Sequence, residues 1–305
     1  MNTPKVYIAM STYNGEKYLE AQIQSILNQT YPNINILIRD DGSTDSTLEI
    51  LKSYEKKFES IKIITGQNKG VIESFMTLLE KIPSDADFVG FSDQDDVWLK
   101  NKIERAVAFL SCKNQDLPLM YFSRLNIVDN DLNFLYKSVE INKISFKNSL
   151  LENIVTGCTI LLNKKAAGIL CGKNINYSKL KMHDAWIYTV ISAFGNIVFD
   201  NIPSINYRQH ENNLIGSSKG LKFWQKRFER FKKNNKETRK QIEEFLRAYF
   251  YELPEEKKQD ISFFLKMAGH KNFFKRFFYA LKFKPQRQSQ LDSLIFKFLI
   301  AMNRI

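Results

Sequence analysis

The sequence predicts an α/β protein built on a doubly wound, mostly parallel sheet. Short apolar runs alternate with segments of helical periodicity along the first third of the chain. Connections of about 20 residues between these runs suit the crossovers that join parallel strands. The run from Phe88 to Phe91 ends directly in Ser92-Asp93-Gln94-Asp95-Asp96. An apolar strand with a polar C-terminal tip is where an open α/β sheet places a ligand site.

Each predicted element has a local signal. In the first helix Leu19, Ile23 and Ile26 keep helical spacing, and Tyr31-Pro32 ends it. Asp45 or Ser43 can cap the second helix. The predicted order is a strand over 6–10, a helix over 17–28, a strand over 34–38, a helix over 46–58, a strand over 61–64, a helix over 71–81, the strand over 88–91 and a helix over 99–110.

The second half of the chain is predicted in less detail. We expect a strand over 119–127, a mixed segment over 135–144 and a buried strand over 153–162 with Gly157 near its start. A helix continues from Trp186, and a strand over 197–199 follows it. Because carboxyl ends of parallel strands share one edge, the loops after the first, second and fourth strands place Tyr13, Asp41 and Asp95 on one rim.

Composition points to a globular protein of the cytoplasm. The chain has 305 residues, 44% of them hydrophobic and 26% charged, enough for one large or two modest domains. Cys112, Cys158 and Cys171 form no paired framework and no metal spacing, as expected of reduced thiols. The sequence has no apolar run of about 18 residues that would span a membrane. The first strand is too short, and its flanks too polar, for a signal peptide.

The net charge of +12 is concentrated in the C-terminal part. Residues 219–305 carry a net charge of +13, and residues 1–218 carry −1. We therefore predict a domain over 1–218 and a basic helical extension over 219–305. The asymmetry indicates that the extension meets an anionic surface, and it argues against a body that binds nucleic acid.

The acidic stretch after Phe91 is the strongest candidate for a metal site. Crowded carboxylates repel one another unless a cation lies between them, and hard oxygen ligands suit Mg²⁺ or Mn²⁺. Asp93 and Asp95 follow an apolar strand directly and precede a helix. The other Asp-x-Asp pairs, Asp85 with Asp87 and Asp129 with Asp131, lack this context and are interpreted as solvated loop acids.

Four motifs follow one another along the first third of the chain. They are Ser11-Thr12-Tyr13-Asn14, Ser25-Ile26-Leu27-Asn28-Gln29-Thr30-Tyr31, Asp40-Asp41-Gly42-Ser43-Thr44-Asp45 and Ser92-Asp93-Gln94-Asp95-Asp96-Val97-Trp98. In this order they resemble glycosyltransferase family 2, which has the GT-A fold. The resemblance covers about residues 4–215, and the acidic motif with Tyr207-Arg208-Gln209-His210 is similar to bacterial rhamnosyltransferase-like members. The extension carries no motif.

The resemblance implies a set of donor-binding residues. Tyr13 can stack on a pyrimidine base, and Asp41 can accept the ring N–H of that base. Lys69 opens a helix near the expected diphosphate. Each has an ordinary alternative: Tyr13 as a core aromatic, Asp41 as a helix cap, and Lys69 as a solvated lysine. The implied nucleotide-binding set is Ser11, Tyr13, Asp41, Lys69 and Asp93.

The resemblance also implies the reacting groups. Asp95 is the expected metal ligand with help from Asp93, and His210 stands where the subgroup has a late histidine. Asp184 matches the catalytic base, although an N-cap aspartate would look the same; its neighbour His183 supports it or is structural. The chain lacks the Gln-x-x-Arg-Trp motif of processive members, which favours addition of one or a few sugars.

The implied function is inverting transfer of a sugar, with Mn²⁺ or Mg²⁺ as cofactor. The expected donor is dTDP-rhamnose or a UDP-sugar, and the expected acceptor is a saccharide or lipid-linked glycan of the cell surface. One alternative is a non-catalytic nucleotide-sugar binding protein that organises a membrane assembly. A nucleotidyltransferase would need a Gly-rich loop after the first strand, and a nucleic-acid binder has support only from charge.

Aromatic and basic residues alternate in the extension, around 223–228 and 273–281. Phe274, Phe277, Phe278 and Leu281 fall on one helical face. A basic amphipathic helix suits docking on anionic lipid, at the inner face of the cell membrane. The competing account is packing of such helices on one another, including across a homodimer.

Overall fold

The computed structural model describes the chain in two compact units. We call the first the sheet unit: residues up to Glu140, Val155–Gly172 and the described residues from Gly195 to 209. The second, the helical unit, comprises Ile141–Ile154, Lys173–Phe194 and the described C-terminal residues. The predicted boundary between 218 and 219 lies outside the described residues and stays a prediction. The described residues are 3–209, 235–270, 272–282, 287–290, 293–295 and 297.

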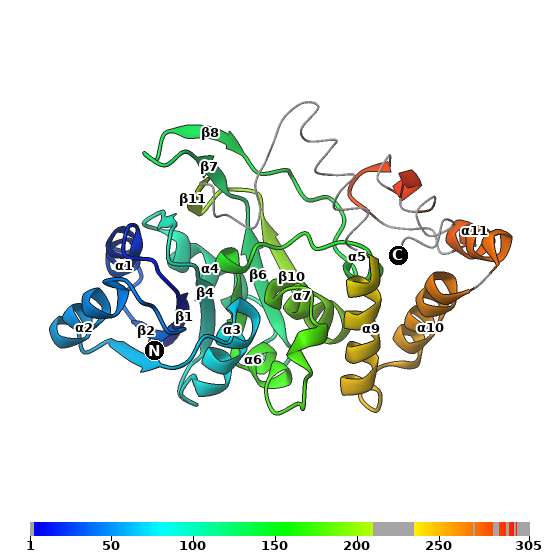
Figure 1. Ribbon diagram of the computed structural model, residues 1–305, viewed down its shortest axis with the longest axis horizontal. Coiled ribbons are helices and arrows are strands. Elements are labelled where there is room, and N and C mark those ends of the chain that lie inside the picture. The colour runs from blue at the N-terminus through cyan, green and yellow to red at the C-terminus, as the bar shows by residue number, and fades with distance from the viewer. Residues whose placement is uncertain are drawn as a thin grey trace. The chain divides into compact units, whose positions relative to one another are not determined.

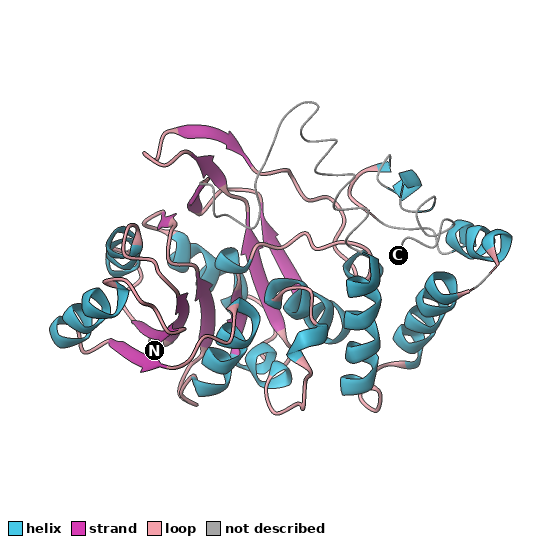
Figure 2. Cartoon of the chain, viewed as in Figure 1, coloured by secondary structure: helices cyan, strands magenta, loops and turns pink. Residues whose placement is uncertain are grey.

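A seven-stranded, mostly parallel sheet forms the centre of the sheet unit, as predicted (Figures 1 and 2). Its strand order is β10-β6-β9-β4-β1-β2-β3. β9 is antiparallel to both of its neighbours, while the remaining pairs are parallel. The strands are β1 (Val6–Thr12), β2 (Ile34–Asp40), β3 (Ile61–Thr65), β4 (Phe88–Ser92), β6 (Leu119–Ser123), β9 (Leu161–Asn163) and β10 (Asn196–Asp200).

The predicted alternation of strands and helices in the first third of the chain is confirmed. Every residue of β4 is buried, as expected of a central strand covered on both faces. Leu19 and Ile23 of the first helix belong to the same buried cluster as Ile8 of β1. The helices of this unit are α1 (Leu19–Leu27), α2 (Thr47–Lys57), α3 (Val71–Lys81), α4 (Lys102–Ser111) and α6 (Lys164–Leu170).

A second sheet, of four strands, was not predicted. Its order is β5-β11-β7-β8, and the strand predicted over 119–127 is divided between the two sheets at Arg124. The Arg124 N–H donates to the carbonyl of Asp200, and its guanidinium donates to the carbonyl of Ser138, so the chain turns there. The strands are β5 (Val97–Trp98), β7 (Asn126–Val128), β8 (Phe134–Lys137) and β11 (Ile205–Arg208).

The strand predicted over 153–162 was also too long. Gly157 begins a 3₁₀ turn, η1 (Gly157–Thr159), and the strand itself starts only at Leu161. The Thr159 hydroxyl donates to the carbonyl of Thr156 at 2.7 Å, and the Ile160 N–H donates to the carbonyl of Gly157. These local hydrogen bonds replace the ladder that an extended strand would form.

The helical unit packs around aromatic side chains. Trp186 contacts Phe245 and Tyr249, with ring centroids 6.0 Å apart in both pairs. No described helix has the length and apolar character needed to cross a membrane. The elements are α5 (Phe146–Ser149), η2 (Tyr177–Lys179), α7 (His183–Phe194), α9 (Asn235–Tyr249), α10 (Glu255–Gly269) and α11 (Phe273–Lys282).

A buried carboxylate fastens α9 to η2. The Glu244 side chain has no exposed surface, and it accepts hydrogen bonds from the Lys179 ammonium at 3.0 Å and from the Asn176 N–H at 2.8 Å. Burial alone raises the pKa of Glu244, but hydrogen bonds from Arg247, Asn176 and Lys179 outweigh burial and hold the pKa at about 2. The carboxylate is therefore stabilised in its charged form.

This pKa gives a first prediction. The folded pKa of Glu244 lies below its ordinary value of 4.5, so its stabilising contribution is complete above pH 4.5 and is lost as the pH falls towards 2. Glu244→Gln should lower the free energy of unfolding at neutral pH, and the deficit should shrink across this window. Urea unfolding followed by tryptophan fluorescence at a series of pH values measures the difference.

The matched control is Glu243→Gln. Glu243 pairs with Arg239 at the surface, where both side chains are more than 40% exposed, so its loss should change stability little. An equal deficit for Glu244→Gln at all pH values would contradict the assignment.

Candidate active site

Strand register brings three loops together at one edge of the large sheet. β1 pairs in parallel with β4 and β2, with Met10 opposite Ser92 and Thr12 opposite Asp40. The chain therefore leaves all three strands at neighbouring points on the same edge. This register and the hydrogen bonds between the loops hold the three loops together.

Tyr13 and Gln94 join the loop after β1 to the acidic loop after β4. The Tyr13 N–H donates to the Gln94 side-chain oxygen at 2.8 Å, and the Gln94 amide donates back to the Tyr13 carbonyl at 3.0 Å. A Cβ at Gly15 would lie 2.3 Å from the oxygen of the same amide, so a larger residue there would displace the Gln94 side chain. The Tyr13 ring is 47% exposed and is open to stacking. Gln94 is a linking residue that sequence reasoning missed.

Ser11 lies in β1, two residues before Tyr13. Its hydroxyl is hydrogen-bonded to the Ser74 hydroxyl at 2.6 Å, which ties β1 to α3. Ser11 is only partly buried. The structure thus gives Ser11 a hydrogen bond within the fold. Its nucleotide-binding role stays a prediction.

Asp40 and Asp41 have different surroundings. Asp40 accepts from the Ser43 N–H at 3.0 Å and from the Ser43 hydroxyl, so it closes the turn that follows β2. Asp41 is 3% exposed, forms an ion pair with the buried Arg39, and accepts from the backbone N–H groups of Lys69 and Gly70 at 2.8 Å. Asp41 therefore fixes the loop before α3 whatever else it binds.

The side chain of Lys69 does not lie alone at the rim. Its ammonium pairs with Glu73, one turn further along α3, at 2.8 Å, and the lysine side chain is 49% exposed. This arrangement matches the solvated alternative for Lys69. Contact with a phosphate stays a prediction that requires the ammonium to exchange partners.

The acidic loop presents two half-buried carboxylates and one buried one. Asp93 and Asp95 are partly exposed, whereas Asp96 is 1% exposed. One oxygen of Asp93, one oxygen of Asp96 and Sγ of Cys158 lie within 4.8 Å of one another. Asp95 is not part of this group, and its role as metal ligand stays a prediction. No sequence signal connects Cys158, which lies in η1, with the acidic loop.

The Asp96 carboxylate is poorly satisfied for a buried group. Its Oδ1 accepts a long hydrogen bond, 3.3 Å, from the Arg208 N–H, and Oδ2 has no partner among the described residues. Burial, then the charges of Asp95 and Asp93, raises the pKa of Asp96 well above its ordinary value. Burial and the charges of Asp96 and Asp93 likewise raise the pKa of the Cys158 thiol. The carboxylate oxygens fit a hard divalent cation, and a protonated thiol is a weaker ligand.

Two buried cationic side chains lie near this loop. Arg208 of β11 is buried, donates to the Asp95 carbonyl at 3.0 Å and to the Asn130 carbonyl, and lies over the Tyr18 ring at 4.5 Å. Lys102 is fully buried, and its ammonium lies 4.0 Å above the Trp98 ring.

The pKa of the Lys102 ammonium reflects its burial near Asp96 and Cys158. Burial lowers it to about 8, although Cys158 and Asp96 oppose the shift. Sequence reasoning quoted Arg208 only within a motif and gave Lys102 no role. His210, the other predicted metal ligand, lies outside the described residues.

Asp184 belongs to the helical unit, in the first turn of α7. Its Oδ1 accepts from the Asn153 amide at 2.9 Å and from the Ala185 N–H at 2.6 Å, and the side chain is 3% exposed. Burial lowers the pKa of the neighbouring His183 to about 3, so this imidazole is neutral at physiological pH. The bond to Ala185 is compatible with the capping alternative, and the catalytic role of Asp184 stays a prediction. Asn153 is a partner that the sequence did not reveal.

Comparison with known proteins gives a family and a relative. The sequence model of Glycosyl transferase family 2 matches residues 7–160. The dTDP-rhamnosyl transferase RfbG of Shigella flexneri is 30% identical over 310 residues, which span 96% of this chain and 99% of RfbG.

Two solved structures are similar in fold. Residues 1–349 of S. aureus TarS, in complex with UDP-GlcNAc, match 92% of this chain and 80% of their own, with a TM-score of 0.60 at 18% identity. The mannosyltransferase PcManGT from Pyrobaculum calidifontis, in complex with GDP-Man and Mn²⁺, matches 99% of this chain and 88% of its own, with a TM-score of 0.53 at 13% identity. The likeness confirms the predicted GT-A fold.

The surroundings of Asp41 give a second prediction. Asp41→Asn leaves the buried Arg39 guanidinium without its carboxylate, and removing one partner of a buried pair typically costs about 3–5 kcal/mol. We expect the free energy of unfolding to fall by about 3 kcal/mol, measured by chemical denaturation without any ligand.

The control is Asp131→Asn, at an exposed position of the loop before β8. Equal stability of Asp41→Asn and wild type would show that the carboxylate is not needed to hold Arg39 in the fold.

Proposed function

The chain belongs to glycosyltransferase family 2, and from this membership we propose that it transfers one or a few sugars from a nucleotide diphosphate-sugar to a hydroxyl of a saccharide acceptor. The observation that carries the proposal is the junction of Tyr13 with Gln94. It holds an exposed aromatic ring beside clustered carboxylates on one sheet edge. A ring for the base and acids for a metal–diphosphate group are what such a donor requires.

Tyr13 and Asp41 are the proposed contacts for the base. A carboxylate has about four lone-pair positions. Arg39 and the amides of Lys69 and Gly70 use three of those on Asp41, which leaves one for a ring N–H of the base. RfbG is named a dTDP-rhamnosyl transferase and TarS is solved with UDP-GlcNAc. We therefore propose dTDP-rhamnose, or else a UDP-sugar, as the donor.

The proposed cofactor is Mn²⁺ or Mg²⁺, held by Asp95 with Asp93 and completed by His210. The buried, unpartnered Oδ2 of Asp96 and the partly exposed acids beside it support a divalent cation here. When bound, such an ion neutralises charge that develops on the leaving diphosphate. One oxygen of the buried Asp96 lies within 4.8 Å of the Sγ of the buried Cys158, so these two groups border the same site.

Asp184 is the proposed general base. Its carboxylate would accept the proton of the acceptor hydroxyl as that oxygen attacks the anomeric carbon. Asn153, which donates to Oδ1, would keep the carboxylate in one orientation during this transfer. Attack opposite the leaving diphosphate inverts the anomeric centre in a single displacement. The proposed acceptor is a lipid-linked glycan at the cytoplasmic face of the cell membrane.

A third prediction tests the metal and the reaction together. In an assay of sugar release from a panel of nucleotide-sugars with Mn²⁺, we expect turnover of one donor, complete loss with EDTA and recovery on adding Mn²⁺. Asp95→Ala should abolish turnover and weaken Mn²⁺ binding in calorimetry, because the proposed ligand is gone.

Asp131→Ala is the control, since it removes an exposed loop acid of the same type. Full activity in EDTA, or an unchanged Mn²⁺ affinity of Asp95→Ala, would overturn the metal assignment.

The fourth prediction tests the base. The hydrogen bonds from Asn153 and Ala185 both reach Oδ1 of Asp184, and the amide oxygen of an asparagine substituted there can still accept them. Asp184→Asn should therefore fold and bind donor normally, while kcat falls by about 10²-fold or more because the proton acceptor is lost.

Asn153→Ala should reduce kcat less, since the carboxylate remains. Loss of donor binding with kcat preserved would make Asp184 a binding residue instead.

A further inference from the structure

The helix α11 has an inner face that attaches it to α10. The Asn272 side chain accepts from the Lys275 N–H at 3.2 Å and so caps the helix. Arg276 is 7% exposed and donates to the His270 carbonyl at 2.6 Å. The Tyr279 ring lies edge-on against Phe263 of α10, with centroids 5.5 Å apart. These contacts fix which side of α11 faces inward.

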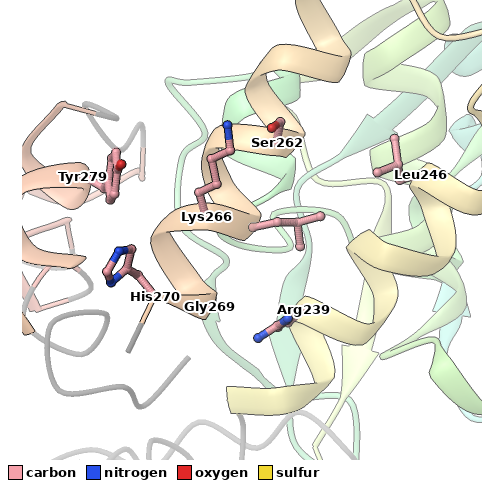
Figure 3. Close-up of a pocket in the computed structure, with 8 residues that line it drawn as sticks. Arg239, Leu246, Ser262, Lys266, Gly269, His270 and Tyr279 are labelled. Carbon is pink, nitrogen blue, oxygen red and sulfur yellow. The ribbon is translucent and has the colours of Figure 1, made fainter. Parts of the chain in front are cut away.

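A cavity of about 580 Å³ lies beside this inner face. Figure 3 shows Tyr279 and His270 on one side of it, Arg239 and Leu246 of α9 on the other, and Lys266 of α10 between them. The ring centroids of Tyr279 and His270 are 6.2 Å apart. Tyr279 is therefore partly buried against α10, although it is part of the aromatic run that the sequence assigned to one amphipathic helix.

The opposite face of α11 consists of exposed phenylalanines. Phe274 is 77% exposed and Phe278 is 54% exposed, while Phe273 and Phe277 are each 41% exposed. The ring centroids of Phe273 and Phe274 are 5.4 Å apart, and those of Phe273 and Phe277 are 6.5 Å apart. The four residues share one face of α11 and form an exposed apolar patch, which we call the phenylalanine face. Patches of this kind on a folded protein mark contact with a protein or a membrane.

Lysines border the phenylalanine face. Lys275 and Lys282 are exposed, and the Lys282 ammonium lies 4.5 Å above the Phe278 ring. The ten residues of α11 include no acid. In contrast, α9 and α10 carry glutamates among their lysines and arginines. Cations also lie over aromatic rings elsewhere in the helical unit, for example Lys258 over Phe250 at 4.8 Å, but α11 combines exposed rings and cations without an acid.

We propose that the phenylalanine face of α11 inserts into the headgroup region of an anionic lipid membrane. The rings would enter the boundary with the acyl chains, while Lys275 and Lys282 remain at the level of the lipid phosphates. Charge complementarity favours lipid over a second copy of the chain, because a symmetric contact would bring these lysines together. The inference goes beyond the proposed function, since membrane binding can be measured without donor or acceptor.

The test compares variants of the full chain in sedimentation with vesicles. Wild type should bind vesicles of equal parts phosphatidylglycerol and phosphatidylcholine, bind pure phosphatidylcholine much less, and dissociate with added NaCl. The double variant Phe274→Ser with Phe278→Ser should bind at least about tenfold more weakly. Lys275→Gln with Lys282→Gln should weaken binding to the anionic vesicles and leave the residual binding less sensitive to salt.

The matched control is Phe250→Ser with Tyr251→Ser, at the end of α9. These aromatics are 46% and 93% exposed, but they precede acidic residues at 252, 255 and 256. The control should bind as wild type does. Equal binding of the Phe274/Phe278 variant and wild type would overturn the proposal, as would equal weakening of the control.

A positional readout separates insertion by α11 from adhesion elsewhere on the chain. Brominated lipid should quench the fluorescence of Phe274→Trp beyond the wild-type background and should not do so for Tyr251→Trp. If wild type is dimeric by light scattering and the Phe274/Phe278 variant is monomeric with unchanged vesicle binding, the face pairs two copies and the lipid assignment fails.

Discussion

The constraint on which the sheet unit depends is the repulsion among three carboxylates in four consecutive residues. Asp93, Asp95 and Asp96 directly follow a fully buried strand, so the start of the acidic loop is held at the edge of the sheet. Buried groups near the loop offset this repulsion. Lys102 places a buried ammonium in the region, and the raised pKa of Asp96 reduces the negative charge there. Arg208 fixes the loop backbone through the Asp95 carbonyl.

The small sheet can be understood as the support for this loop. β5 follows the acids immediately, and its Trp98 supplies the ring beneath Lys102. β11 pairs with β5 and brings Arg208 against the loop backbone. Buried cations are expensive without partners, and a helix N-terminus is a poor place for a lysine. Lys102 is nevertheless buried at the start of α4, where the charge of Asp96 favours its protonated form.

The sequence predicts local features well and distant partners poorly. The first four strands of the large sheet and their shared edge follow from periodicity and the geometry of parallel crossovers, which depend on neighbouring residues. Cys158 comes 62 positions after Asp96 in the sequence, but its Sγ lies close to the carboxylates of the acidic loop. No residue pattern around Cys158 indicates this proximity. Asn153 next to Asp184 is the same case. The prediction of a strand over 153–162 was wrong because a threonine hydroxyl closes a turn within this range. The apolar content of the segment does not reveal such a turn.

The distribution of cations near the rim favours a divalent ion as the neutralising group for a diphosphate. Among the described residues at this edge, Arg39 is paired with Asp41 and the Lys69 ammonium is paired with Glu73. Arg208 is committed to backbone carbonyls. Lys102 is buried and has no exposed surface from which to meet a substrate. An anionic donor would therefore approach half-buried carboxylates, while these four cationic side chains are buried or already paired with other groups of the protein. In the proposed function, a divalent cation bound by both the donor and the loop would supply this attraction, and clustered Asp93 and Asp95 suit such an ion.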